Sequence, residues 1–164
     1  MNTKPQTAIA TKIINAPAKD IYRIIADYHT MHYFILPKQY FLSLDVEEGG
    51  FGQGTIVNFE MRILGKTQSF RSLVTEPQPG RLLVETDIRS ETPTSFSVFP
   101  VRNNDQARVE ISTELKNQNA VEALIANILL QKVYRDELEL LAKVAEENVK
   151  LTRSSSTNKP NQLS

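Results

Sequence analysis

The sequence has no cysteine, no excess of either charge and no long apolar run, and each absence removes a class of function. Without cysteine there is no disulfide framework, thiol nucleophile or thiolate metal site. The 19 Lys and Arg residues balance the 19 Asp and Glu residues, so no net charge attracts phosphate backbones or anionic membranes. No segment approaches the ~20 apolar residues of a membrane span. We therefore expect no nucleic-acid partner and no stable membrane insertion.

The composition that remains is typical of a globular protein. Of the 164 residues, 40% are hydrophobic and 23% are charged, far from the composition of disordered chains. This length fits one domain, which we place at residues 1–151. Residues 152–164 are rich in Ser, Thr and Asn and predict a disordered tail. The N-terminus has no apolar stretch of signal-peptide length, which predicts a cytoplasmic protein.

Alternating segments separated by turn residues predict an antiparallel sheet. The segments are residues 7–14, 41–47, 55–64, 67–75, 81–87, 94–99 and 107–115. Short Gly, Pro and Asn turns join the last six, whereas parallel neighbours would need long crossovers. The apolar side chains that should point to the covered face are Val57, Phe59, Met61, Ile63, Phe70, Val74, Leu82, Val84, Phe96, Val98, Val109 and Ile111.

Two or three segments predict helices. Residues 17–27 carry apolar side chains at helical spacing, and residues 28–40 form a second short helix or a tight loop. Residues 120–151 contain neither Pro nor Gly and predict one long helix. Charged pairs four residues apart mark its solvent face. The stripe that we expect to be buried comprises Val121, Leu124, Ile125, Ile128, Leu138, Leu141, Val144 and Ala145.

Glu60 with Arg62 and Glu85 with Asp87 stand two apart on their predicted strands. We expect both pairs on a solvated outer face. A shift of one residue in register would bring them inside, where they would become acid/base candidates.

The histidines and glycines offer weaker candidates for chemistry. His29 and His32 have a spacing that suits a shared metal, but zinc needs three or four ligands, so we predict no metal site. His32 is better placed as a general base, because aromatic neighbours would shift its pKa. The glycine-rich run at 49–54 joins two strands rather than a strand and a helix, which argues against a phosphate loop.

Three short motifs resemble those of a known superfamily. They are the apolar-x-Ala-Pro start and closing Ala-Asp of residues 14–27, the Gly-x-Gly-Thr of residues 52–55, and the Glu-Pro and Gly-Arg-Leu of residues 74–82. With the element order, they resemble the helix-grip fold of the START-like (SRPBCC, polyketide cyclase/dehydrase-like) superfamily over residues 8–149. Residues 103–106, Asn-Asn-Asp-Gln, depart from the double glycine that such proteins often carry there.

The resemblance implies an α+β fold in which a curved antiparallel sheet of about seven strands wraps a long C-terminal helix, with two short helices after the first strand. It also implies an apolar cavity between sheet and helix, holding a small hydrophobic ligand such as a lipid, a quinone or a polyketide-like molecule. No cofactor is expected. The expected ligand-binding residues are Tyr28, His32, Tyr33, Phe34, Phe59, Met61, Phe70, Val84, Phe96, Val98 and Ile128.

Two alternatives stay open. One is a cyclase or dehydratase-type enzyme that uses the same cavity, with His32, Tyr33, Tyr28 and Arg62 as candidate proton-transfer groups. The other is an interaction module that uses the groove for another protein's helix or for lipid. The sequence assigns no catalytic residue and does not indicate the oligomeric state.

Overall fold

The computed structural model describes residues 6–115 and 119–157, and these residues contain one seven-stranded sheet. Its strands are β1 (Gln6–Ile14), β2 (Phe41–Glu48), β3 (Ile56–Ile63), β4 (Lys66–Gln78), β5 (Leu82–Asp87), β6 (Pro93–Val101) and β7 (Gln106–Leu115). They are arranged in the order β1-β7-β6-β5-β4-β3-β2, and every neighbouring pair is antiparallel. The predicted sheet is confirmed.

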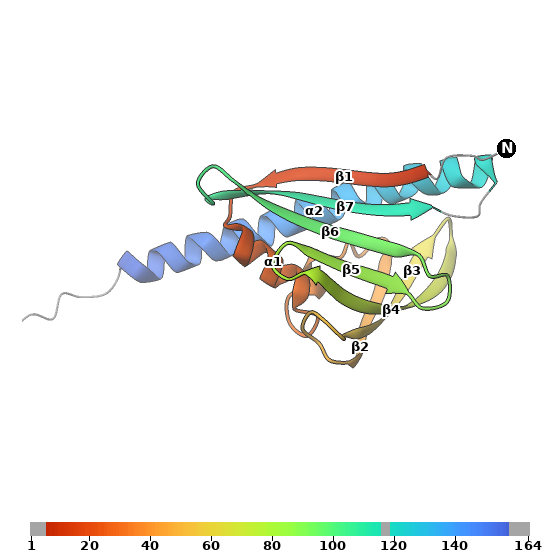
Figure 1. Cartoon of the computed structure of the whole chain (residues 1–164), viewed down its shortest axis with the longest axis horizontal. Coiled ribbons are helices and arrows are strands. Elements are labelled where there is room, and N and C mark those ends of the chain that lie inside the picture. The colour runs from red at the N-terminus through yellow and green to blue at the C-terminus, as the bar shows by residue number, and fades with distance from the viewer. Residues whose placement is uncertain (1–5, 116–118, 158–164) are drawn as a thin grey trace, which may run out of the picture.

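The helices are α1 (Ala18–Ala26), the short 3₁₀-helix η1 (His32–Ile35) and α2 (Ala120–Thr157). Figure 1 shows α2 running along one side of the sheet and extending beyond it at its C-terminal end. Asn119 starts α2 by accepting a hydrogen bond from the Glu122 backbone N–H, a favourable N-terminal cap. The helix continues past the predicted end at residue 151. The rest of the predicted tail, residues 158–164, lies outside the described residues.

The inner face of the sheet and the helices enclose one core. The expected inward orientation is confirmed for β3, β4, β6 and β7, where side chains such as Val57, Val74, Phe96 and Val109 are buried. They pack in the same cluster as Ile21 and Ile25 of α1 and Leu138 and Leu141 of α2. Burial of this apolar surface stabilises the fold by roughly 25 cal/mol per Å².

The predicted orientation of β5 is wrong by one residue. Leu83 is fully buried and Glu85 points inward, so Leu82 and Val84 face outward. Leu82, Leu83 and Val84 are all apolar, so alternation alone did not fix the register. Cross-strand pairing does: Glu85 stands opposite the buried Val74 on β4 and opposite Thr94 on β6, and directly opposite residues share a face.

The predicted burial of the first half of the α2 stripe is also wrong. Val121, Leu124, Ile125 and Ile128 are 45–67% exposed, whereas Leu138, Leu141 and Ala145 are buried. Ile128 and Leu138 are ten residues apart, a spacing that does not return to the same side of a helix with 3.6 residues per turn. The two apolar groups are therefore out of phase, and only the second faces the sheet.

Candidate functional site

A group of polar side chains lies inside the apolar core, where Tyr28, His32 and Glu85 meet. The Tyr28 hydroxyl donates a hydrogen bond of 2.5 Å to Glu85 Oε1. The His32 ring stacks on Tyr28 at 4.3 Å between centroids, and its Nδ1 lies 2.6 Å from the Ile25 carbonyl oxygen. Because a carbonyl only accepts, Nδ1 carries the proton and Nε2 presents a lone pair toward Glu85 Oε1, 3.6 Å away.

Glu137 of α2 brings a second carboxyl into this interior. Glu137 is 2% exposed, and its Oε1 has no hydrogen-bond partner among the described residues. One turn earlier, the Tyr134 hydroxyl is 2.5 Å from Thr113 Oγ1, which in turn is 2.7 Å from Thr94 Oγ1. Thr94 and Thr113 stand beside Glu85 in one row across the sheet. We call Tyr28, His32, Glu85, Tyr134 and Glu137 the interior cluster.

Burial controls the protonation of the interior cluster. It raises the pKa of Glu85 to about 7, against the opposing effect of the Tyr28 hydrogen bond. Burial, together with the nearby Glu85, raises the pKa of Glu137 well above its ordinary value. Burial lowers the pKa of His32 to about 4, so His32 is neutral near pH 7. The cluster thus holds two acids that favour their protonated forms and no cationic partner.

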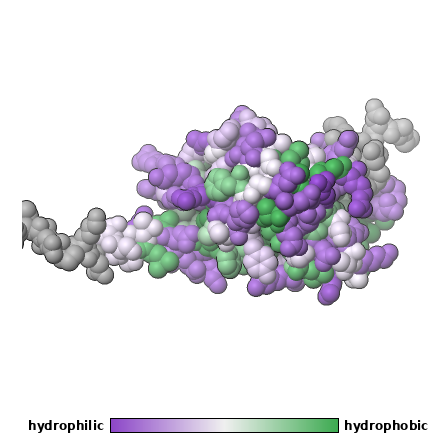
Figure 2. Space-filling view, turned by 90° about the horizontal axis from the view of Figure 1, so that it is seen from below, coloured by the Kyte–Doolittle hydropathy of each residue, from purple (hydrophilic) through white to green (hydrophobic). Residues whose placement is uncertain are grey.

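A surface groove of about 460 Å³ is lined in part by Tyr28, a member of the interior cluster. Tyr33 and Phe34 of η1 line it and are 44% and 58% exposed, while Leu44 and Val46 of β2 also line it. Tyr28 lines the groove as well but is only 1% exposed, so it joins the groove to Glu85. Seen from below, the surface shows apolar areas among mainly hydrophilic residues (Figure 2).

The glycine-rich run holds Tyr28 in place. The Gly50 carbonyl accepts a hydrogen bond of 2.9 Å from the Tyr28 backbone N–H. Gly50 has a φ of +125°, and a Cβ there would lie 1.9 Å from Nε2 of His29, so only glycine fits. His29 Nε2 in turn lies 2.9 Å from the Gly49 carbonyl oxygen. The run therefore positions Tyr28.

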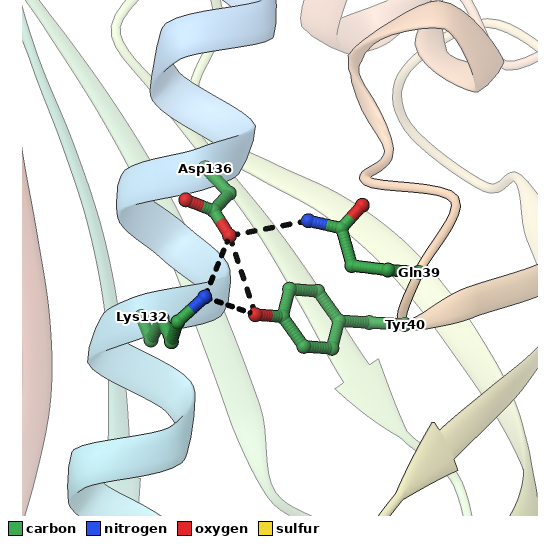
Figure 3. Close-up of polar contacts among 4 residues, drawn as sticks. All are labelled: Gln39, Tyr40, Lys132 and Asp136. Atoms are coloured by element: carbon green, nitrogen blue, oxygen red, sulfur yellow. Dashed lines mark hydrogen bonds and ion pairs between the residues drawn. The ribbon is translucent and has the colours of Figure 1, made fainter.

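A second polar group lies on the outside of α2 and ties the helix to the segment before β2. Asp136 Oδ2 accepts from Gln39 Nε2 at 3.2 Å and from the Tyr40 hydroxyl at 3.3 Å. Lys132 Nζ donates to the Tyr40 hydroxyl at 2.8 Å and lies 3.5 Å from Asp136 Oδ2. Figure 3 shows these four residues, which we call the latch, joining α2 to the loop.

The predicted ligand-binding residues fall into three places. The interior face holds Tyr28, His32, Phe59, Met61, Phe70, Phe96 and Val98. Tyr33 and Phe34 line the groove outside. Val84 lies on the outer face of β5, and Ile128 is 61% exposed on α2, so neither reaches the interior space to which it was assigned.

The charged residues proposed from the strand pattern also lie in different places. Glu60 and Arg62 are exposed on the outer face of β3, as expected, while Glu85 points inward. Asp87 accepts hydrogen bonds from Ser90 and from the Arg71 backbone in the turn after β5. Among the residues that the structure describes, no three His, Asp or Glu side chains form a group able to hold a metal ion.

Sequence reasoning missed Glu137 and Tyr134. A usable signal exists, because Glu137 stands four residues before Leu141 and four after Val133, in the buried line of α2. An acid at an apolar position of a helix is a candidate for function.

The comparisons with known proteins agree with the observed fold. The family model described as polyketide cyclase / dehydrase and lipid transport matches residues 6–146. The chain belongs to this family. The polyketide cyclase / dehydrase and lipid transport family accounts for the helix-grip fold, and its match ends within α2. No curated protein matches the sequence. In the described part of the chain, no helix is long and apolar enough to span a membrane.

Solved structures show the same fold as this family member. An NMR structure of KanY protein is 23% identical, covers 88% of this chain and 99% of that chain, and has a TM-score of 0.77. The Zhui aromatase/cyclase of Streptomyces sp. R1128 is 14% identical over 89% and 96% of the two chains, with a TM-score of 0.73. Norcoclaurine synthase of Thalictrum flavum, in complex with dopamine and hydroxybenzaldehyde, is 17% identical over 88% of each, with a TM-score of 0.69. At these identities the similarity shows the fold alone.

Proposed function

We propose that the protein binds a small, mainly apolar molecule between the inner face of the sheet and α2, with access through the groove. The observation that carries this proposal is Glu137 Oε1, a buried oxygen without a hydrogen-bond partner among the described residues, in a mainly apolar interior. Such an atom costs about 1–3 kcal/mol of stability, a cost that a bound molecule with a complementary group offsets. The groove that we assign as the entrance has a volume of about 460 Å³, which is large enough to admit a small molecule.

The binding test uses the neutral fluorescent probe N-phenyl-1-naphthylamine and native mass spectrometry of gently purified protein. We expect saturable binding of one probe per chain. Leu44→Trp would fill the groove and should weaken the probe about tenfold or more, equivalent to ~1.4 kcal/mol. Leu73→Trp is the matched control, because Leu73 lies on the outer face of β4. No bound molecule and no probe affinity would contradict the proposal, as would equal effects of the two variants.

A second candidate function is an enzyme of the cyclase or dehydratase type in the same site. Glu85 favours it, because a carboxyl with a pKa of about 7, hydrogen-bonded to Tyr28, suits proton transfer near neutral pH. Tyr28 and His32, two of the four expected proton-transfer groups, lie beside it, whereas Tyr33 is in the groove and Arg62 is outside.

Glu85→Gln separates the two candidates. In an enzyme that uses Glu85, this variant should lose turnover of a polyketide-like substrate while probe affinity changes by less than about twofold, since only proton transfer is removed. Turnover that survives the substitution would exclude Glu85 as the acid or base.

A further inference from the structure

With its two carboxyl groups ionised, the interior cluster has more hydrogen-bond acceptors than donors. His32 Nδ1–H is committed to the Ile25 carbonyl, so His32 Nε2 is an acceptor. The Tyr28 hydroxyl is committed to Glu85, and the Tyr134 hydroxyl belongs to the chain with Thr113 and Thr94. Glu137 Oε1 has no partner. No Lys or Arg is among the buried described residues.

We infer that the ligand of this site carries a protonated amine, whose N–H groups bind the Glu137 carboxylate while an apolar body lies against the sheet. This inference rests on the proposed binding function and names the class of ligand. An ammonium group supplies three donors and no acceptor, which complements the cluster better than a hydroxyl or a carbonyl does.

Electrostatic interactions favour the same class of ligand as the hydrogen bonds do. In the free protein, burial raises the pKa of both carboxyl groups, and repulsion from Glu85 raises the pKa of Glu137 further, so both groups favour the protonated form. A cation beside Glu137 reverses that balance, because the charge attraction favours the carboxylate. The amine then binds as the ammonium ion, and the carboxyl releases its proton to solvent, so charge and atoms balance. Charge-assisted hydrogen bonds of this kind are the stronger ones in proteins.

Three isosteric probes test this class: 1-naphthylmethylamine, 1-naphthalenemethanol and 1-ethylnaphthalene. They differ only in an amine, a hydroxyl or a methyl group at the end of the same side chain. By calorimetry at neutral pH, we expect the amine to bind about tenfold to 100-fold more tightly than either neutral probe. Its binding should also release a proton, seen as a dependence of the heat on the buffer.

Glu137→Gln should abolish the amine preference and leave 1-ethylnaphthalene binding within about twofold, which also shows that the variant folds. Glu147→Gln makes the same change at an exposed position of α2 and should preserve the preference. Equal affinities for the three probes, or a preference that survives Glu137→Gln, would overturn the inference but leave the binding function standing. Failure of all three probes to bind would overturn both.

Discussion

Asp136 and Glu137 follow each other in α2, yet they have opposite surroundings. Asp136 faces the latch, where one carboxylate oxygen meets Gln39, Tyr40 and Lys132 near solvent. Glu137 faces the core, 2% exposed, with one oxygen that has no partner. Asp136 holds α2 to the segment before β2. The unpartnered oxygen of Glu137 lowers the stability of the fold. Residues that cost stability in this way often serve function. For this reason we propose that the site lies between the sheet and α2.

The largest effect that we expect is a pH dependence of the free energy of unfolding. It distinguishes the buried carboxyl of Glu85 from the exposed carboxyl of Glu60. Glu85 binds its proton more tightly in the folded chain, with a pKa of about 7, than at its ordinary value of 4.5. Glu85 by itself should therefore lower the free energy of unfolding on the order of 3 kcal/mol as the pH rises from about 4.5 to about 7. Glu137, whose pKa is also raised, adds to this fall, whereas His32, whose pKa is lowered to about 4, opposes it. The difference in the free energy of unfolding between the wild-type protein and Glu85→Gln should therefore change by this amount over that pH range, whereas the difference for Glu60→Gln, on the exposed outer face, should stay constant. Denaturant titrations at a series of pH values measure both.

Replacing the unpartnered carboxyl should stabilise the protein. We expect Glu137→Leu to raise the free energy of unfolding by about 2 kcal/mol at neutral pH, because it replaces a buried polar side chain with an apolar side chain of similar size. Asp136→Leu, one residue earlier, should lower it, since three donors lose their acceptor. Urea unfolding of the two variants provides the comparison. A destabilised Glu137→Leu would show that Glu137 supports the fold.

Removing the interior hydroxyl should have an intermediate effect. Tyr28→Phe should cost about 1.5 kcal/mol, because Glu85 loses its one hydrogen-bond donor in the cluster. It should also raise the pKa of Glu85 above about 7, since the Tyr28 bond lowers that pKa. Carbon-13 NMR of labelled glutamate carboxyls would follow this shift. An unchanged titration of Glu85 would contradict the contact.

The smallest effect belongs to the latch. Tyr40→Phe removes bonds to Asp136 and Lys132 at a partly buried position and should cost about 1 kcal/mol. The titration of Glu85 should not change. Thermal unfolding together with the same NMR titration checks both statements, and a shifted Glu85 titration would mean that the latch and the interior are coupled.

The fold was predictable from the sequence because period-2 segments, short turns and an uninterrupted helix all indicate one architecture. The site was predictable only in part. Tyr28 and His32 were found through their aromatic surroundings, but Glu85 was expected outside, because three apolar residues precede it and leave the register open. Glu137 was overlooked since the charged pairs of α2 suggested a solvent-facing acid. Cross-strand pairing decides the position of Glu85 and is not encoded in a local pattern, whereas the position of Glu137 has a local signal in its spacing to Val133 and Leu141.

The most direct test of the account is the carbon-13 titration of the glutamate carboxyls with and without N-phenyl-1-naphthylamine, assigned with Glu85→Gln and Glu137→Gln. We expect that both resonances titrate far above the ordinary glutamate range and move when the probe binds. Ordinary titration of both groups, or probe-induced shifts confined to exposed glutamates, would contradict a ligand site inside the grip.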